Sequence, residues 1–120
     1  MIERIHPAGA TPRGPYSPAV RAGDTIYISG QVAGQPGDVQ AETRQVLTNI
    51  KNILEACGAS MADVVRCGVF LTDAAQFKAM NEVYAEFFGE ARPARTTVIV
   101  AALPLPTAKV EIDAVAYKPK

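Results

Sequence analysis

The sequence has few of the side chains from which metal sites and nucleophilic relays are built. It contains one histidine, His6, and two cysteines, Cys57 and Cys67, which do not form a C-x-x-C motif. No metal site follows from this set at the usual ligand spacings. A Ser-His-Asp relay would have to use His6, which lies in a Gly/Pro-rich segment. We therefore expect no metal ion, and free buried thiols in place of a disulfide or redox pair.

The sequence also lacks an excess of charge and a long apolar run. Twelve Lys and Arg balance twelve Asp and Glu, so the formal net charge is zero. This balance gives no electrostatic footprint for nucleic acid or for an anionic membrane. The longest apolar stretches are far shorter than the ~20 residues that span a bilayer, and residues 1–5 lack the apolar core of a signal peptide. We expect a cytoplasmic protein with no membrane partner, and the neutral charge disfavours nucleic acid as a partner.

What is present favours one compact α+β domain over residues 1–120. The hydrophobic fraction is 48% and the charged fraction is 20%, as in ordinary globular proteins. The patterns predict helices at 39–57 and 74–88, and strands at 2–5, 19–21, 25–29, 64–71, 95–102 and 109–117. Residues 6–18 form a rigid Pro/Gly-rich loop. The resulting architecture is a mixed sheet with two helices on one face.

Helical periodicity identifies the faces that should pack on the sheet. One stripe of the first helix and one stripe of the second are apolar, and Asp73 is placed to cap the second. The stripes comprise Val46, Ile50, Ile53, Leu54 and Cys57 in the first helix, and Phe77, Met80, Tyr84 and Phe87 in the second. We expect both stripes to lie in the core.

The strands carry apolar residues on both faces. In the strand at 64–71, alternation places Val65 with Cys67 on one face and Val64 with Phe70 on the other. Two helices cover only one side of a sheet, so the other apolar face needs a partner. A closed homo-oligomer is the simplest source of that partner.

Two charged residues interrupt the last two strands. Arg95 precedes Thr96-Thr97-Val98, and Glu111 stands between Val110 and Ile112. Charges in strands are costly unless they are paired or bind a ligand. A guanidinium and a carboxylate on neighbouring strands could hold a small anionic substrate and move protons beside it. A structural ion pair between Arg95 and Glu111 is an equal alternative from these residues alone.

Several short motifs, taken together, resemble the RidA family, also called the YjgF or L-PSP family. They are Gly14-Pro15-Tyr16-Ser17-Pro18, Ser29-Gly30-Gln31, Asn81 within Met80-Asn81-Glu82, Pro93-Ala94-Arg95-Thr96-Thr97 and Val110-Glu111-Ile112. The resemblance covers essentially the whole chain. It implies a chorismate-mutase-like fold and a homotrimer with sites between subunits. It also implies hydrolysis of small-molecule enamines and imines, such as 2-aminoacrylate, to 2-oxo acids and ammonia.

Carried over residue by residue, the resemblance assigns the site. Arg95 looks like the carboxylate-binding arginine and Glu111 like the acid that positions or activates water. Tyr16, Ser29, Gly30 and Thr97 look like substrate-binding residues, and Asn81 resembles a recurrent asparagine with a structural role. Packing of Tyr16 in the loop, and a strand-ending role for Ser29, remain open alternatives. Many members carry Cys where this chain has Thr97, which excludes thiol oxidation there, and the loop at 31–40 is shorter than in typical members.

The chemistry suits these groups. Arginine offers paired N–H donors that match a carboxylate, and a carboxylate near the C=N carbon can take a proton from attacking water. No cofactor is required, because an imine already hydrolyses in water. Two other functions remain open. A ribonuclease or translation inhibitor is opposed by the neutral charge and the single histidine, whereas a non-catalytic 2-oxo acid binder or chaperone would need Arg95 but not Glu111.

Overall fold

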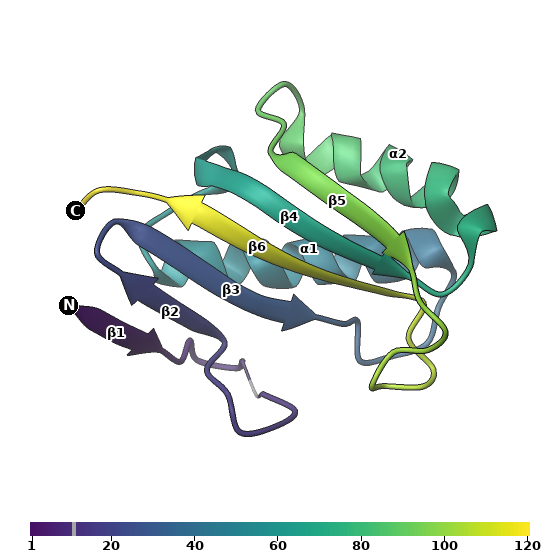
Figure 1. Ribbon diagram of the computed structural model, residues 1–120, viewed down its shortest axis with the longest axis horizontal. Coiled ribbons are helices and arrows are strands. Elements are labelled where there is room, and N and C mark those ends of the chain that lie inside the picture. The colour runs from purple at the N-terminus through teal and green to yellow at the C-terminus, as the bar shows by residue number, and fades with distance from the viewer. Residues whose placement is uncertain (11) are drawn as a thin grey trace.

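The computed structural model describes residues 1–10 and 12–120, and it contains a six-stranded sheet with two helices on one face (Figure 1). The strands are β1 (Ile2–Ile5), β2 (Ala19–Ala22), β3 (Thr25–Gln31), β4 (Val64–Leu71), β5 (Ala94–Ile99) and β6 (Val110–Tyr117), and the helices are α1 (Val39–Ala56) and α2 (Phe77–Phe88). The strand order is β1-β2-β3-β6-β4-β5. Only β4 and β5 pair in parallel among these neighbours. The predicted α+β fold is confirmed.

The core lies between the helices and the sheet. From α1 it takes Val46, Leu47, Ile50, Ile53 and Leu54, which meet Ile26 and Ile28 of β3 and Ile112 and Ala114 of β6. Both cysteines are free, Cys67 buried and Cys57 only partly so. Within the described residues, neither helix combines the length and apolarity that crossing a bilayer requires.

The start of α2 differs from the prediction. Residues Ala74–Gln76 form a 3-10 turn, and α2 begins only at Phe77. Asp73 accepts a hydrogen bond from the Ala75 N–H at 2.9 Å, so it caps this 3-10 turn, whereas the N-cap residue of α2 is Gln76, which makes no side-chain cap. Phe77 is 42% exposed and does not join Met80 in the core. Its position in the first turn, beside the sheet edge strand β5, places its ring against the Arg95 guanidinium instead.

The alternation of β4 also departs from the prediction at one point. Val64 is buried and Val65 is half exposed, the reverse of the predicted faces. The register against β6 shifts between Val64 and Arg66, which is a β-bulge. A bulge adds one residue to one strand and so inverts the faces on either side of it. From Cys67 onward, the predicted alternation is confirmed.

The sheet surface opposite the helices, called the open face below, carries large apolar side chains. Tyr27, Val98 and Tyr117 are each at least 40% exposed. Register places them on this face, because Tyr27 is opposite Val115 and Val98 is opposite Phe70. Exposed apolar area of this extent is typical of an interaction surface. The predicted need for a partner surface is therefore consistent with the exposed side chains.

A buried glutamate anchors the short loop before α1. Glu42 is 1% exposed, and its carboxylate accepts from the Lys109 N–H at 2.8 Å and from the Gly37 N–H at 3.3 Å. The Lys109 ammonium lies 3.4 Å away and also donates to the Gly37 carbonyl at 2.6 Å. These contacts join the loop to the residue that precedes β6. They therefore hold the start of β6, where Glu111 stands.

Replacement of Glu42 by leucine should destabilise the fold. Glu42→Leu leaves the Lys109 and Gly37 N–H groups without acceptors, at a cost of about 2 kcal/mol or more. Glu42→Gln keeps one oxygen acceptor, so it should lower the free energy of unfolding by less. Urea unfolding at a fixed protomer concentration measures both variants. Equal stability of Glu42→Leu and the parent protein would show that this anchor is dispensable.

Candidate functional site

Arg95 and Glu111 lie on opposite faces of the sheet. Arg95 pairs with Cys67, which faces the helices, whereas Glu111 pairs with Phe70 on the open face. The prediction that they occupy neighbouring strands is wrong, because β4 lies between β5 and β6. The parallel pairing of β4 with β5, which sequence alone did not reveal, causes this separation. A structural ion pair between these two residues within one chain is thereby excluded.

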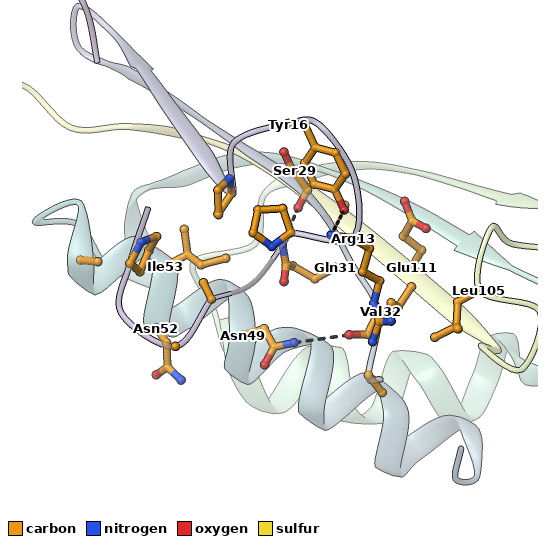
Figure 2. Close-up of a pocket in the computed structure, with 18 of the residues that line it drawn as sticks. Arg13, Tyr16, Ser29, Gln31, Val32, Asn49, Asn52, Ile53, Leu105 and Glu111 are labelled. Carbon is orange, nitrogen blue, oxygen red and sulfur yellow. Dashed lines mark hydrogen bonds between the residues drawn. The ribbon is translucent and has the colours of Figure 1, made fainter. Parts of the chain in front are cut away.

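Glu111 lines a cavity of about 950 Å³, called the Glu111 cavity below (Figure 2). The cavity lies between loop residues 7–10 and 12–18, β3, the start of β6 and one side of α1. Three more of the expected site residues line it with Glu111, namely Tyr16, Ser29 and Gly30. The volume is near the upper end of the ~300–1,000 Å³ that ligand pockets usually have. The structure thus brings four of the six expected site residues together.

The Glu111 carboxylate is seated against the backbone of Gly30. A methyl group on the Gly30 α-carbon would overlap the Glu111 Oε2 atom. Gly30 lies in an irregular part of β3, because the register against β6 jumps between Ile28 and Gln31. Such bulges occur next to active sites, where they redirect side chains. The absence of a side chain at Gly30 therefore leaves the space that the Glu111 carboxylate occupies.

The environment of Glu111 disfavours its charged form relative to a carboxyl group in water. Burial raises the pKa of Glu111 above its usual value of 4.5, and the negative charge of Asp113 raises it further. Asp113 stands two residues along β6, on the same face. Its Oδ1 atom accepts from the Gly68 N–H at 2.8 Å, which fixes the second carboxylate. A raised carboxyl pKa in a cavity is a frequent property of acid–base groups.

Hydrogen bonds hold the two hydroxyl residues of the cavity. Ser29 Oγ donates to the Ser17 carbonyl at 2.7 Å, so its hydroxyl can only accept from a ligand. The Tyr16 hydroxyl accepts from the Arg13 N–H at 3.3 Å, and the Tyr16 ring is 45% exposed. Tyr16 is therefore not a packed loop aromatic. Its phenol proton remains free to donate into the cavity.

Arg95 belongs to a second, smaller cavity of about 380 Å³ between α2 and the start of β5. Its guanidinium carbon lies 4.7 Å from the centre of the Tyr84 ring and 5.6 Å from that of Phe77. Cation–π contacts of this kind contribute ~0.5–2 kcal/mol and orient the guanidinium. Two buried polar atoms, Asn81 Oδ1 and the Tyr84 hydroxyl, lack hydrogen-bond partners among the described residues. Burial raises the pKa of Tyr84, so this hydroxyl stays protonated.

The other residues are placed as follows. Thr97 pairs with Val69 on the helix side, two residues beyond Arg95, and lines neither cavity. Asn81, expected to be structural, lines the cavity that holds Arg95. Asn81 is three residues before Tyr84, so both lie on one side of the helix. This spacing could have indicated from the sequence that Asn81 lies near Tyr84. Arg13, which lines the Glu111 cavity, was not predicted at all.

Comparison with known proteins identifies the family of this chain. Residues 7–118 match the family described as Endoribonuclease L-PSP. A RutC family protein of Pyrococcus horikoshii is 50% identical over 114 residues, which cover 89% of this chain and 90% of that protein. A 2-iminobutanoate/2-iminopropanoate deaminase of Capra hircus is 44% identical over 127 residues, which cover 98% of this chain and 92% of that protein.

Comparison with a solved structure indicates the same family. The crystal structure of RidA from an Antarctic Psychrobacter superposes with a TM-score of 0.85 at 43% identity, covering 89% of this chain and 91% of that chain. The family match spans the loop with Tyr16, both cavities and β6. The chain therefore belongs to the L-PSP family, which is also called the YjgF or RidA family.

Proposed function

We propose that the protein hydrolyses reactive 2-imino acids, and the enamines that are their tautomers, to 2-oxo acids and ammonia. The observation that carries the proposal is the Glu111 carboxyl group. It lies against Gly30 in a cavity, and its pKa is raised. The name of the Capra hircus relative, a 2-iminobutanoate/2-iminopropanoate deaminase, supports the same reaction.

The complete site combines two copies of the chain. Arg95 and Glu111 lie on opposite faces of one sheet, so one protomer cannot apply both to one small substrate. The open face carries exposed Tyr27, Val98 and Tyr117, which a neighbouring copy would cover. A ring of identical contacts gives every site an arginine from one protomer and a glutamate from the next. The family resemblance supports a homotrimer as the form of this ring.

In this site Arg95 binds the substrate and Glu111 transfers protons. Arg95 binds the substrate carboxylate through two N–H donors, and the Tyr84 ring keeps its guanidinium oriented. Glu111 takes a proton from water as the water oxygen bonds to the carbon of the protonated imine, whose C=N π electrons move to nitrogen. The Glu111 carboxyl then gives that proton to the amine nitrogen. The C–N bond breaks and ammonia leaves, while the hydroxyl proton returns to the Glu111 carboxylate as the C=O bond forms. The raised pKa of Glu111 suits these proton transfers.

Cleavage of RNA finds less support in the same geometry. The only histidine, His6, lies 3.4 Å from Ser17 Oγ and lines neither cavity among the described residues. A non-catalytic metabolite binder is separated from an enzyme by the first experiment below.

Replacement of Glu111 by glutamine should abolish hydrolysis but not binding. Glu111→Gln keeps the size of the side chain and removes its base, so kcat should fall by ~10²–10⁴-fold. An amino-acid dehydratase would generate 2-aminoacrylate in the assay, and pyruvate release would be followed with and without the protein. Titration with a 2-oxo acid checks that the variant still binds. Full activity of Glu111→Gln would remove Glu111 from the role of base.

The pH profile should report the environment of Glu111. Catalysis needs the carboxylate, so kcat/KM should fall as pH drops through a pKa above the usual 4.5. Asp113→Asn removes the neighbouring negative charge and keeps an oxygen for the Gly68 N–H. The acidic limb of the profile should therefore move to lower pH in this variant. An unmoved or opposite shift would show that another group controls the limb.

Mixing two inactive variants should restore activity. Arg95→Ala and Glu111→Gln protomers are unfolded together, refolded together and assayed. If each site takes Arg95 from one protomer and Glu111 from its neighbour, about a quarter of the sites in random mixed rings are intact. Each variant refolded alone is the control and should stay inactive. A mixture as inactive as its components would contradict a site shared between copies.

A further inference from the structure

The Glu111 cavity contains a cation that the reaction described above does not use. Arg13 lines this cavity, and its charge is of opposite sign to that of Glu111. In the part of the chain that the structure describes, no carboxylate forms an ion pair with Arg13. Burial and Asp113 raise the pKa of Glu111, the opposite of what a close guanidinium would do. Arg13 therefore does not serve as the counter-ion of Glu111.

Arg13 is positioned across the cavity by its backbone and by a glycine. Its N–H donates to the Tyr16 hydroxyl at 3.3 Å, which fixes the loop beside the site. A side chain at Gly34 would come within 2.9 Å of Arg13 Nη2, so the guanidinium lies against the Gly34 backbone. Figure 2 shows the Arg13 side chain running from the Tyr16 end of the cavity toward Val32. The Arg13 guanidinium thus lies against the backbone of the short loop before α1, at a glycine whose φ of +85° few other residues adopt.

The cavity is larger than a three-carbon substrate requires. Its volume of about 950 Å³ extends from Glu111 to Asn52, Ile53 and Ala56 of α1. Pockets of this size usually hold drug-sized ligands. A substrate with a longer side chain can therefore lie between Glu111 and the far wall, with Arg13 at its flank.

We propose that Arg13 binds a second carboxylate of the substrate. The preferred substrates are then dicarboxylic 2-imino acids that contain four or five carbon atoms in the whole molecule. The proposal rests on the imine hydrolysis proposed above and assigns its substrate class. Arg95 of one copy takes the carboxylate next to the imine carbon, and Arg13 takes the distal carboxylate. Guanidinium and carboxylate form paired charge-assisted hydrogen bonds, which a neutral side chain cannot make.

The test compares one acidic and one neutral imine on three proteins. A D-aspartate oxidase acting on D-glutamate generates the five-carbon dicarboxylic imine, and a D-amino-acid oxidase acting on D-alanine generates 2-iminopropanoate. Trapping with semicarbazide measures the imine that the protein has not yet hydrolysed. The proteins are the parent chain, Arg13→Gln, and Arg4→Gln as a matched control. Arg4 is an exposed arginine of β1 that lines neither cavity.

The parent should prefer the acidic imine in kcat/KM. Arg13→Gln should lower this preference roughly tenfold, by the loss of about one charge-assisted hydrogen bond, with little change for 2-iminopropanoate. Arg13→Lys, which keeps a point charge, should fall between the two, and Arg4→Gln should match the parent. An unchanged preference in Arg13→Gln overturns the proposal and leaves imine hydrolysis intact.

If the parent hydrolyses neither imine, the proposed reaction fails and binding decides the role of Arg13. Calorimetric titration then compares 2-oxoglutarate with 2-oxobutanoate as stable analogues. Weaker binding of 2-oxoglutarate alone in Arg13→Gln supports the second carboxylate site. Equal effects on the two oxo acids, or none, overturn it.

Discussion

The alternation of side chains along β6 is the constraint from which the site follows. Val110, Ile112, Ala114 and Ala116 are buried against the helices. The residues between them must then face the opposite way, because successive side chains in a strand alternate. Glu111 and Asp113 are among those residues. A slip of one residue would expose the apolar set and bury two carboxylates, so packing of the core also fixes the register of the acid.

The same alternation separates the two charged residues that define the candidate site. Arg95 points to the helix side, where Tyr84 supplies an aromatic surface, and Glu111 points to the open face. The surroundings of Arg95 and those of Glu111 each lack a partner. Near Arg95, Asn81 and Tyr84 carry buried polar atoms without hydrogen-bond partners among the described residues, and on the side of Glu111 the open face exposes large apolar side chains. A second copy, as proposed above, would meet both needs with one contact. Oligomerisation and chemistry would then share a single physical cause.

Much of this arrangement could be predicted from local patterns. The six strands and the apolar stripe of α1 from Val46 to Leu54 depend on residues close in sequence, and the structure confirms them. Asp73 is a capping residue as predicted, but of the 3-10 turn that leads into α2. Strand order does not depend on local residues. The strand predicted at 64–71 is confirmed as β4, and the one predicted at 95–102 is observed as β5 but ends at Ile99. Nothing in these residues reveals that β4 separates β5 from β6. The Val64–Arg66 bulge likewise depends on pairing with β6.

Arg13 illustrates the other limit of sequence reasoning. An arginine in a Pro/Gly-rich loop has no periodicity to indicate a role. Its placement depends on Tyr16 and on Gly34, a residue in another loop. Glu42 was overlooked for a similar reason, since its partners Gly37 and Lys109 come from two segments that only the folded chain brings together.

The contact between Glu111 and Gly30 has a consequence for how the protein can change over generations. A single methyl group at position 30 would displace the carboxylate of position 111. A substitution at Gly30 can therefore move the Glu111 carboxylate without changing Glu111 itself. If Glu111 has the proposed role, the side chain at position 30 restricts which variants keep that role.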